Sequence, residues 1–337
     1  MTHDLAGDDA GTNETNGTNA ADVAETARTA GRIIDELTRA LSSSREVASL
    51  AVATFVASGH LLLEDVPGVG KTTLARALAR AIGGDIRRIQ FTPDMLPGDL
   101  TGVNVWSQAE GRFVFHPGPL FANIVIADEI NRANPKTQSA MLEAMGEGRI
   151  SVDGESHALD DPYFVVATQN PIELEGTYPL PEAQLDRFMA CTGFGYPDED
   201  AEAAMVSAPD WARPLDRVST VCDVDTAVRM RGTARRIAVS RPVAAYVVAL
   251  TRATRHREGV AYGASPRASL ALAAMARAAA AIDGRDYVLP DDVQRFAVPV
   301  IAHRLVLDDA MRSGESDLET ARDVVRDVVA DVPVPRA

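Results

Sequence analysis

The sequence predicts an α/β protein in two parts: a core built on a five-stranded parallel sheet, and a smaller all-α domain. Two observations support this prediction. Up to about residue 200, short apolar runs alternate with stretches of helical periodicity, as expected when buried parallel strands are joined by helices. Beyond that point the strand signals stop and only helical periodicity remains, which indicates a separate helical domain.

We therefore expect three segments: a disordered acidic tail over 1–25, an α/β core over 26–200 and a helical domain over 201–337. The tail is rich in Asp, Gly, Asn and Thr and has few large apolar residues, a composition typical of disorder. Helices are expected at 26–41 and 44–57. The chain then enters the first strand.

The predicted strands of the core are its short apolar runs, and two β-hairpins are expected between them. The strands are 60–63, 86–91, 124–127, 163–168 and 191–194. Apolar alternation around Glu110-Gly111 predicts a hairpin over 99–118, and Asp153-Gly154 predicts one over 149–159. Helices are expected after the first strand, ending at Gly83-Gly84, and over 135–147. In the second domain they are expected over 226–237, 242–256, 265–282 and 291–305.

Charge and composition narrow the functional classes. The net charge of −15 argues against non-specific nucleic-acid binding, because phosphate backbones repel an acidic surface. Lysine occurs only at Lys71 and Lys136, so nearly all of the 33 basic residues are arginines. An acidic, lysine-poor chain is typical of a halophile, although GC-biased codon usage would also favour arginine.

The sequence also indicates where the protein resides. It contains no apolar run of 18 residues and no apolar stretch near its N-terminus, so neither a transmembrane helix nor a signal peptide is expected. Its two cysteines, Cys191 and Cys222, do not have the spacing of a metal or redox motif. We therefore expect a cytoplasmic protein without membrane insertion.

One glycine-rich stretch lies between the first strand and a helix, and it matches a phosphate-binding P-loop. Its residues are Pro67, Gly68, Val69, Gly70, Lys71, Thr72 and Thr73. Backbone amides of such a loop converge on phosphate oxygens at a helix N-terminus. Lys71 would reach the β- and γ-phosphates, and the Thr72 hydroxyl would ligate Mg²⁺. Asp65 departs from the motif, which has glycine at that position.

Three polar residues follow two other predicted strands. Asp128 and Glu129 come directly after the apolar run 124–127, and Asn170 follows the run 163–168. Carboxyl ends of parallel strands meet at the ligand-binding edge of a sheet. There Asp128 would hold Mg²⁺, and Glu129 would deprotonate an attacking water. Asn170 would hydrogen-bond γ-phosphate and water if its strand lies beside the other two; otherwise Asn170-Pro171 is an ordinary turn.

Two arginines are candidates for stabilising charge on a transferred phosphoryl group. Arg187 lies in the stretch Leu185-Asp186-Arg187-Phe188, and nothing local distinguishes it from an ordinary salt-bridged arginine. Arg267 follows Ser265-Pro266 at a predicted helix start in the second domain. It would either bridge that domain to the nucleotide or lie on the surface.

Taken together, these stretches resemble the MoxR family of AAA+ ATPases. The resemblance covers about residues 26–330 and is carried by segments 59–72, 90–99, 118–121, 128–133, 167–171 and 178–188. It implies an AAA+ core with a helical lid, binding ATP and Mg²⁺. Asp65 is common at its position in this family. The family's usual Gly-Gln pair upstream of the P-loop is replaced by residues 41–46, Leu-Ser-Ser-Ser-Arg-Glu, so the adenine contacts stay open.

The resemblance also implies roles for single residues. Lys71 and Thr72 match Walker A, and Asp128 and Glu129 match Walker B. Asn170 matches sensor 1, Arg187 the arginine finger that acts on a neighbouring subunit, and Arg267 sensor 2. Whether Arg187 or Arg132 is the main trans-acting arginine stays open. The two hairpins resemble the helix-2 insert and the pre-sensor hairpin of this clade.

The expected function is Mg²⁺-dependent ATP hydrolysis by a hexameric ring. By resemblance, its role would be chaperone-like remodelling, or metal-cofactor insertion, on a protein client. The expected partner has a von Willebrand factor A domain. Two alternatives stay open. A nucleic-acid motor is encouraged only by the arginine-rich stretch 252–257. A non-hydrolysing regulatory switch would bind ATP with negligible turnover.

Overall fold

In the computed structural model the described residues are 19–41, 45–65, 70–170, 177–196, 199–207, 214–308, 311 and 317–335. The core sheet within them is parallel and has five strands, which confirms the predicted fold class. Its strand order is β2-β5-β8-β1-β9. The strands are β1 (Leu61–Glu64), β2 (Ile86–Gln90), β5 (Ile124–Asp128), β8 (Phe164–Gln169) and β9 (Ala190–Thr192).

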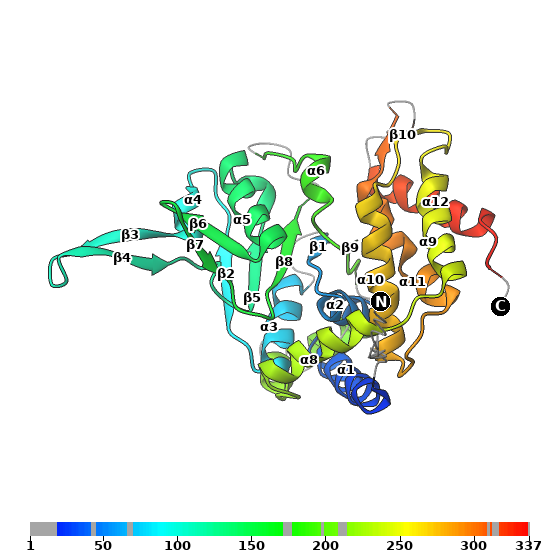
Figure 1. The fold of residues 1–337 in the computed structure, drawn as a ribbon, viewed down its shortest axis with the longest axis horizontal. Coiled ribbons are helices and arrows are strands. Elements are labelled where there is room, and N and C mark those ends of the chain that lie inside the picture. The colour runs from blue at the N-terminus through cyan, green and yellow to red at the C-terminus, as the bar shows by residue number, and fades with distance from the viewer. Residues whose placement is uncertain are drawn as a thin grey trace, which may run out of the picture.

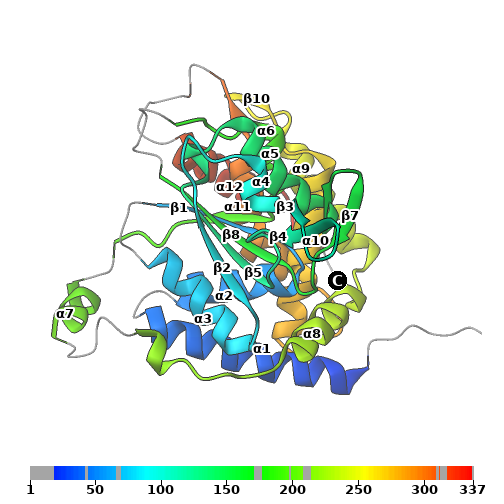
Figure 2. The same ribbon diagram turned by 90° about the vertical axis from the view of Figure 1, so that its left-hand side faces the viewer.

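Both faces of the sheet are covered, because successive side chains of a strand point to opposite sides. Leu61 and Leu63 pack into one buried cluster with α1 (Ala20–Leu41), α2 (Arg45–Val56) and α3 (Lys71–Ile82). Leu62, between them, belongs to a second cluster on the side of α5 (Pro135–Glu147). Figure 2 shows these helices on the two sides of the sheet. The near-continuous apolar strands of the sequence thus reflect burial on both faces.

Helix α1 begins at Ala20, earlier than expected, so the predicted tail over 1–25 is wrong for its last residues. Asp22 lies in the first helical turn, where a carboxylate interacts favourably with the helix dipole. Val23 and Thr26 are buried, each 2% exposed. Burial of this face therefore outweighs the polar composition that suggested disorder. Residues 1–18 lie outside the described part of the chain.

The two predicted hairpins are present. Strands β3 (Gly102–Ser107) and β4 (Arg112–Pro117) pair antiparallel, and Figure 1 shows this ribbon projecting away from the sheet. Strands β6 (Arg149–Val152) and β7 (Glu155–Ala158) form the second hairpin. Its turn residues Asp153 and Gly154 have φ of 50° and 87°, the left-handed values that such a turn needs and that Asp-Gly accommodates.

The C-terminal part of the described chain is mainly helical. Helix α8 (Val224–Arg236) packs on α1 and α2, while α9 (Arg241–Thr254), α10 (Pro266–Ile282), α11 (Pro290–Ile301) and α12 (Asp317–Asp331) form a helical bundle. A short sheet of β10 (Val260–Tyr262) and β11 (Val306–Leu307) was not expected, because such short strands show no periodicity. Among the described residues, no helix is both long and apolar enough to cross a bilayer.

Candidate active site

The carboxyl ends of β2, β5 and β8 meet the N-terminus of α3 around a cavity of about 320 Å³. Five of the predicted site residues line it together: Lys71, Thr72, Asp128, Glu129 and Asn170. Gly70 and Thr73 line it as well. The other predicted phosphate-loop residues, Pro67, Gly68 and Val69, lie outside the described residues.

The phosphate end of the cavity is formed by the start of α3. Gly70 precedes this helix with φ of 101°, a left-handed conformation that favours glycine. Helix α3 therefore begins at Lys71 with its N-terminal amides at the cavity, the arrangement that binds phosphate groups. Lys71 Nζ donates to the carbonyl oxygen of Asp65 at 2.7 Å. Burial lowers the pKa of Lys71, while Asp65, Asp128 and Glu129 act in the opposite direction.

Asp128 ends β5 and is 6% exposed. Its Oδ2 accepts from Arg88 Nε at 2.6 Å and from the Thr72 hydroxyl at 3.5 Å. Its Oδ1 accepts from the Thr168 hydroxyl at 3.3 Å. The carboxylate is thus fixed from both oxygens, and its Oδ2 faces the residue predicted to share a metal ion with it.

Glu129 has an unusual backbone, with φ 57° and ψ 49°. This left-handed conformation is uncommon for a residue other than glycine and is enriched at functional sites. The Glu129 amide donates to the Thr168 hydroxyl at 2.9 Å. Its carboxylate accepts from Gln90 Nε2 at 2.7 Å and from Arg132 Nη1 at 3.0 Å. The turn therefore directs a hydrogen-bonded carboxylate to the cavity edge.

Sequence reasoning missed three lining residues: Arg88, Gln90 and Thr168. Strand β2 pairs with β5, and Gln90 lies opposite Asp128 in the register. Arg88 and Gln90 are two residues apart and share a face of the strand. Polar residues with this spacing at a strand end were the available signal, but only the strand order shows that they face Asp128 and Glu129.

Asn170 directly follows β8, which lies between β5 and β1. The structure thus has the strand order on which the predicted role of Asn170 depends. The residue is 6% exposed and lines the same cavity as Lys71 and Asp128. Its carbonyl oxygen accepts from Asn131 Nδ2 at 3.4 Å.

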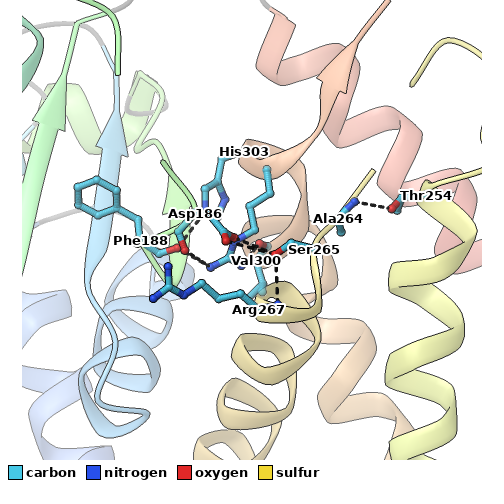
Figure 3. Close-up of polar contacts among 9 residues, drawn as sticks. Asp186, Phe188, Thr254, Ala264, Ser265, Arg267, Val300 and His303 are labelled. Atoms are coloured by element: carbon cyan, nitrogen blue, oxygen red, sulfur yellow. Dashed lines mark hydrogen bonds and ion pairs between the residues drawn. The ribbon is translucent and has the colours of Figure 1, made fainter. Parts of the chain in front are cut away.

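The two predicted arginines do not line this cavity. Arg187 follows the short helix α6 (Glu182–Leu185), and its Nη1 donates to the carbonyl oxygen of Leu142 in α5. Arg267 lies exposed in the first turn of α10, where its amide donates to the Ser265 hydroxyl at 3.2 Å. Its side chain extends from this turn toward the core (Figure 3). Arg132, the other candidate, forms an ion pair with Glu129 of its own chain.

A larger cavity of about 680 Å³ lies between the core and the helical bundle. Its walls come from the start of α2, the end of β9 and the residues after it, and helices α11 and α12. Asp65 connects it to the phosphate end, because its carboxylate accepts from the amides of Phe194 at 2.5 Å and Gly195 at 3.0 Å. The unusual motif residue therefore links the phosphate loop to the chain segment that leaves the sheet.

Comparisons with known proteins identify this architecture. Residues 60–190 match the model of the ATPase family associated with various cellular activities (AAA), and residues 252–328 match the AAA lid domain. The chain is 44% identical to YeaC of Bacillus subtilis over 90% of its length and 94% of that protein. It is 41% identical to Chaperone MoxR1 of Mycobacterium tuberculosis, with 82% of this chain and 75% of that protein covered.

A solved structure agrees with these relatives. The crystal structure of a candidate ATPase from Cytophaga hutchinsonii superposes with a TM-score of 0.84 and 33% identity, covering 94% of this chain and 98% of that one. The predicted parallel core and helical lid region are thus confirmed. The protein belongs to the MoxR family of AAA+ ATPases.

Proposed function

We propose that this protein hydrolyses ATP with Mg²⁺ at the cavity lined by Lys71, Asp128 and Glu129. The observation that carries this proposal is the convergence of a helix N-terminus, a lysine, two carboxylates and an amide on one cavity. The helix N-terminus and the lysine would bind phosphate groups, and a carboxylate beside them could activate a water molecule for attack. This combination fits hydrolysis better than nucleotide binding alone.

The residues at the phosphate end fit a magnesium ion. Mg²⁺ prefers oxygen ligands and usually retains waters and phosphate oxygens around one or two protein groups. Thr72 Oγ1 and Asp128 Oδ2, which lie 3.5 Å apart, supply such groups. The phosphate oxygens of a bound nucleotide would supply further ligands, as is usual for Mg²⁺ in ATPase sites. Bound there, the ion would neutralise charge on the β- and γ-phosphates.

Glu129 is our proposed general base, and Asn170 and Lys71 orient the γ-phosphate. Glu129 accepts two hydrogen bonds, from Gln90 and Arg132, which hold its carboxylate at the cavity edge. A carboxylate in this place can act as the general base that accepts a proton from water. The buried amide of Asn170 provides a neutral donor and acceptor at the same edge.

We propose that the nucleoside occupies the larger cavity beside Asp65. This cavity offers the apolar side chains of Val47, Leu50, Phe194 and Phe296 to a base, and such surfaces are typical of ligand pockets. Val47 and Leu50 lie in α2, directly after the segment that replaces the family's Gly-Gln pair. A Val47→Trp variant should fill this space and weaken nucleotide binding at least ten-fold, measured with a fluorescent ATP analogue.

We further propose a cytoplasmic, hexameric ring in which Arg187 acts on the nucleotide of the neighbouring subunit, while Arg267 acts within its own chain. Arg187 lies outside the cavity of its own chain, as a trans-acting group must. By analogy with Chaperone MoxR1, we propose a chaperone-like action on a protein client. The family resemblance implies that this action is remodelling or metal-cofactor insertion. The proposed partner contains a von Willebrand factor A domain. Co-purification from native extract tests this partner.

The central experiment is Glu129→Gln. This variant should bind ATP as the wild type does but lose turnover by about 100-fold or more, because the amide cannot accept the water proton. Glu143→Gln, at an exposed position of α5, is the matched control and should keep normal turnover. Unchanged turnover in Glu129→Gln would refute the assignment of the base.

The structure offers less support for the two alternatives. Within the arginine-rich stretch 252–257, Arg255 donates to the Ala264 carbonyl, and Arg257 forms ion pairs with Asp327 and Asp331. These contacts use two of the three arginines in the stretch that a nucleic-acid motor would need. Stimulation of ATPase activity by DNA at high salt would revive that alternative. Negligible turnover by assembled wild-type rings would favour the regulatory switch.

A further inference from the structure

The segment Asp186–Phe188, which carries Arg187, belongs to the core but is held by the helical bundle. It connects α6 with β9, and Phe188 is fully buried in the core cluster beside α5. Figure 3 shows Asp186 and Phe188 facing the first turn of α10 and the end of α11. Contacts across this boundary therefore determine where Arg187 lies.

Arg304, in the 3₁₀ turn η3 (Ala302–Arg304) after α11, makes most of these contacts. Its Nη2 donates to the carbonyl oxygens of Phe188 at 2.7 Å and of Asp186 at 3.3 Å. Its Nε lies 2.8 Å from Asp186 Oδ1, with the Arg304 side chain 3% exposed. A buried guanidinium with several fixed acceptors holds a backbone segment in one geometry. Burial lowers the pKa of Arg304 to about 10, so the group remains charged at neutral pH.

Two further side chains of the bundle contact the same segment. His303 Nε2 lies 3.0 Å from the Phe188 carbonyl oxygen, so this ring nitrogen carries the proton. The Ser265 hydroxyl donates to Asp186 Oδ2 at 3.2 Å. Ser265 also caps α10 and accepts from the amide of Arg267. Hydrogen bonds thus run from the turn that carries Arg267 to the residue preceding Arg187.

On the opposite side, Arg187 lies against α5. Its Nη1 donates to the Leu142 carbonyl, and a Cβ added at Gly146 would lie 2.9 Å from the same nitrogen. The arginine therefore lies between a helix of the core and a segment fixed by the bundle. A shift of the bundle relative to the core would either move this segment or break its contacts with Arg304.

We propose that Arg304 is a positioning residue for Arg187, so that the lid of one subunit sets the position of the arginine presented to its neighbour. This inference rests on the proposed trans-action of Arg187. The lid is in turn linked to its own nucleotide cavity, which α11 and α12 help to line. Nucleotide bound in one subunit would thereby influence hydrolysis in the next.

The test uses mixed rings. Arg304→Gln alone should bind ATP normally and lose turnover on the order of 100-fold, as expected when a reacting group is displaced by about 1 Å. A 1:1 mixture with Glu129→Gln should regain activity, because Glu129→Gln subunits supply a correctly placed Arg187 to intact Arg304→Gln sites. If the two variants mix at random, half of the subunits are Arg304→Gln, and half of these receive Arg187 from a Glu129→Gln neighbour. Roughly a quarter of all subunits therefore have this arrangement. A mixture without recovered activity would refute the proposal.

Two controls separate this outcome from others. A mixture of Arg187→Ala with Glu129→Gln tests trans-action itself; if it recovers activity and the Arg304→Gln mixture does not, only the positioning role fails. If neither mixture recovers activity, the trans-action fails and the positioning role fails with it.

Arg231→Gln is the matched structural control: Arg231 is a buried arginine that binds Asp161 and the carbonyls of Phe55 and Tyr163. It should lower the melting temperature but keep turnover per folded subunit.

A milder variant covers the case in which Arg304→Gln does not fold. Asp186→Asn keeps the side-chain shape at a position that is 20% exposed but weakens the pairing with Arg304. It should lower turnover about ten-fold at unchanged ATP affinity, consistent with loss of one charge-assisted contact, and should also recover activity with Glu129→Gln. Normal turnover in Asp186→Asn would contradict the proposal.

Discussion

Arg88 Nε lies 2.6 Å from Asp128 Oδ2, the oxygen that also faces Thr72. The carboxylate proposed to interact with Mg²⁺ therefore already pairs with a cation from the neighbouring strand. A guanidinium and a hydrated magnesium ion would compete for this carboxylate oxygen. Either cation can occupy the lone pairs of the oxygen and balance the negative charge of the carboxylate. The Arg88 side chain is 48% exposed, so breaking its ion pair with Asp128 costs little free energy.

Arg88→Gln should therefore lower the Mg²⁺ concentration that half-saturates ATP binding by about two- to five-fold, the size expected for a partly exposed ion pair. Titration of Mg²⁺ with a fluorescent ATP analogue measures this directly. Arg87→Gln is the matched control, since Arg87 is adjacent but points to the other face of β2. An unchanged or higher Mg²⁺ requirement in Arg88→Gln would show that the ion pair does not compete.

Gly146→Ala should separate stability from activity. Gly146 lies in the last turn of α5, and alanine is favoured over glycine in a helix by up to about 1 kcal/mol. The added Cβ would lie 2.9 Å from Arg187 Nη1 and push this flexible side chain away. We expect an unchanged or higher melting temperature with turnover reduced ten-fold or more.

Gly232→Ala in α8 is the control for Gly146→Ala, because its nearest neighbour would be 3.6 Å away, at Arg236 Nη1. It should show only the gain in stability. Equal turnover in the two glycine variants would mean that the position of Arg187 is not critical.

Two buried histidines should make the fold sensitive to acid. Burial lowers the pKa of His60 to about 4 and that of His303 to about 3. Below the unfolded pKa of about 6.5, the unfolded chain binds protons that the native chain does not. Stability is therefore fully present above that value and falls as the pH drops toward 4, by about 1.4 kcal/mol per pH unit for each histidine.

Denaturant unfolding at pH 7.5 and 5.5 measures this loss, and His60→Gln should remove part of it. Glu64 acts in the opposite direction, because burial raises its pKa, but it is one group against two histidines. Stability that stays constant or rises on acidification to pH 5.5 would contradict this account.

Salt should stabilise the protein if its acidity reflects adaptation to a saline cytoplasm. The chain has 48 acidic and 33 basic residues, and repulsion within such an acidic fold is screened as the Debye length falls from about 10 Å at 0.1 M to about 3 Å at 1 M salt. We expect the melting temperature to rise between low and molar KCl. A constant or falling value would favour codon bias as the origin of the arginine-rich composition.

The sequence was sufficient for the local parts of the site and insufficient for the parts that depend on strand order. Gly70 to Thr73 form a contiguous signal, and Asp128 with Glu129 follows an apolar strand, so both could be recognised along the chain. Arg88 and Gln90 reach the cavity only because β2 pairs with β5. No residue near them in the sequence indicates that β5 is the neighbouring strand. The start of α1 was predicted to be disordered because the segment is polar in composition. That composition does not reveal that Val23 and Thr26 are buried against the rest of the fold.

The same limit applies to Asp186. In the sequence it is an ordinary acid beside Arg187, and its partner Arg304 lies more than a hundred residues away in another helical segment. The division of the chain at residue 200 stays a prediction, because α8 packs on α1 and α2 and also on α10.

The left-handed backbone of Glu129 limits which inactive variants will be informative. Gln keeps an unbranched side chain and tolerates φ of 57° about as well as Glu does. A β-branched replacement such as Val or Thr would add backbone strain of roughly 1 kcal/mol or more at the end of β5. Such a variant would lose activity through a distorted turn as well as a missing carboxylate. Mutational tolerance at position 129 therefore reports on geometry and chemistry together, and only unbranched substitutions isolate the chemistry.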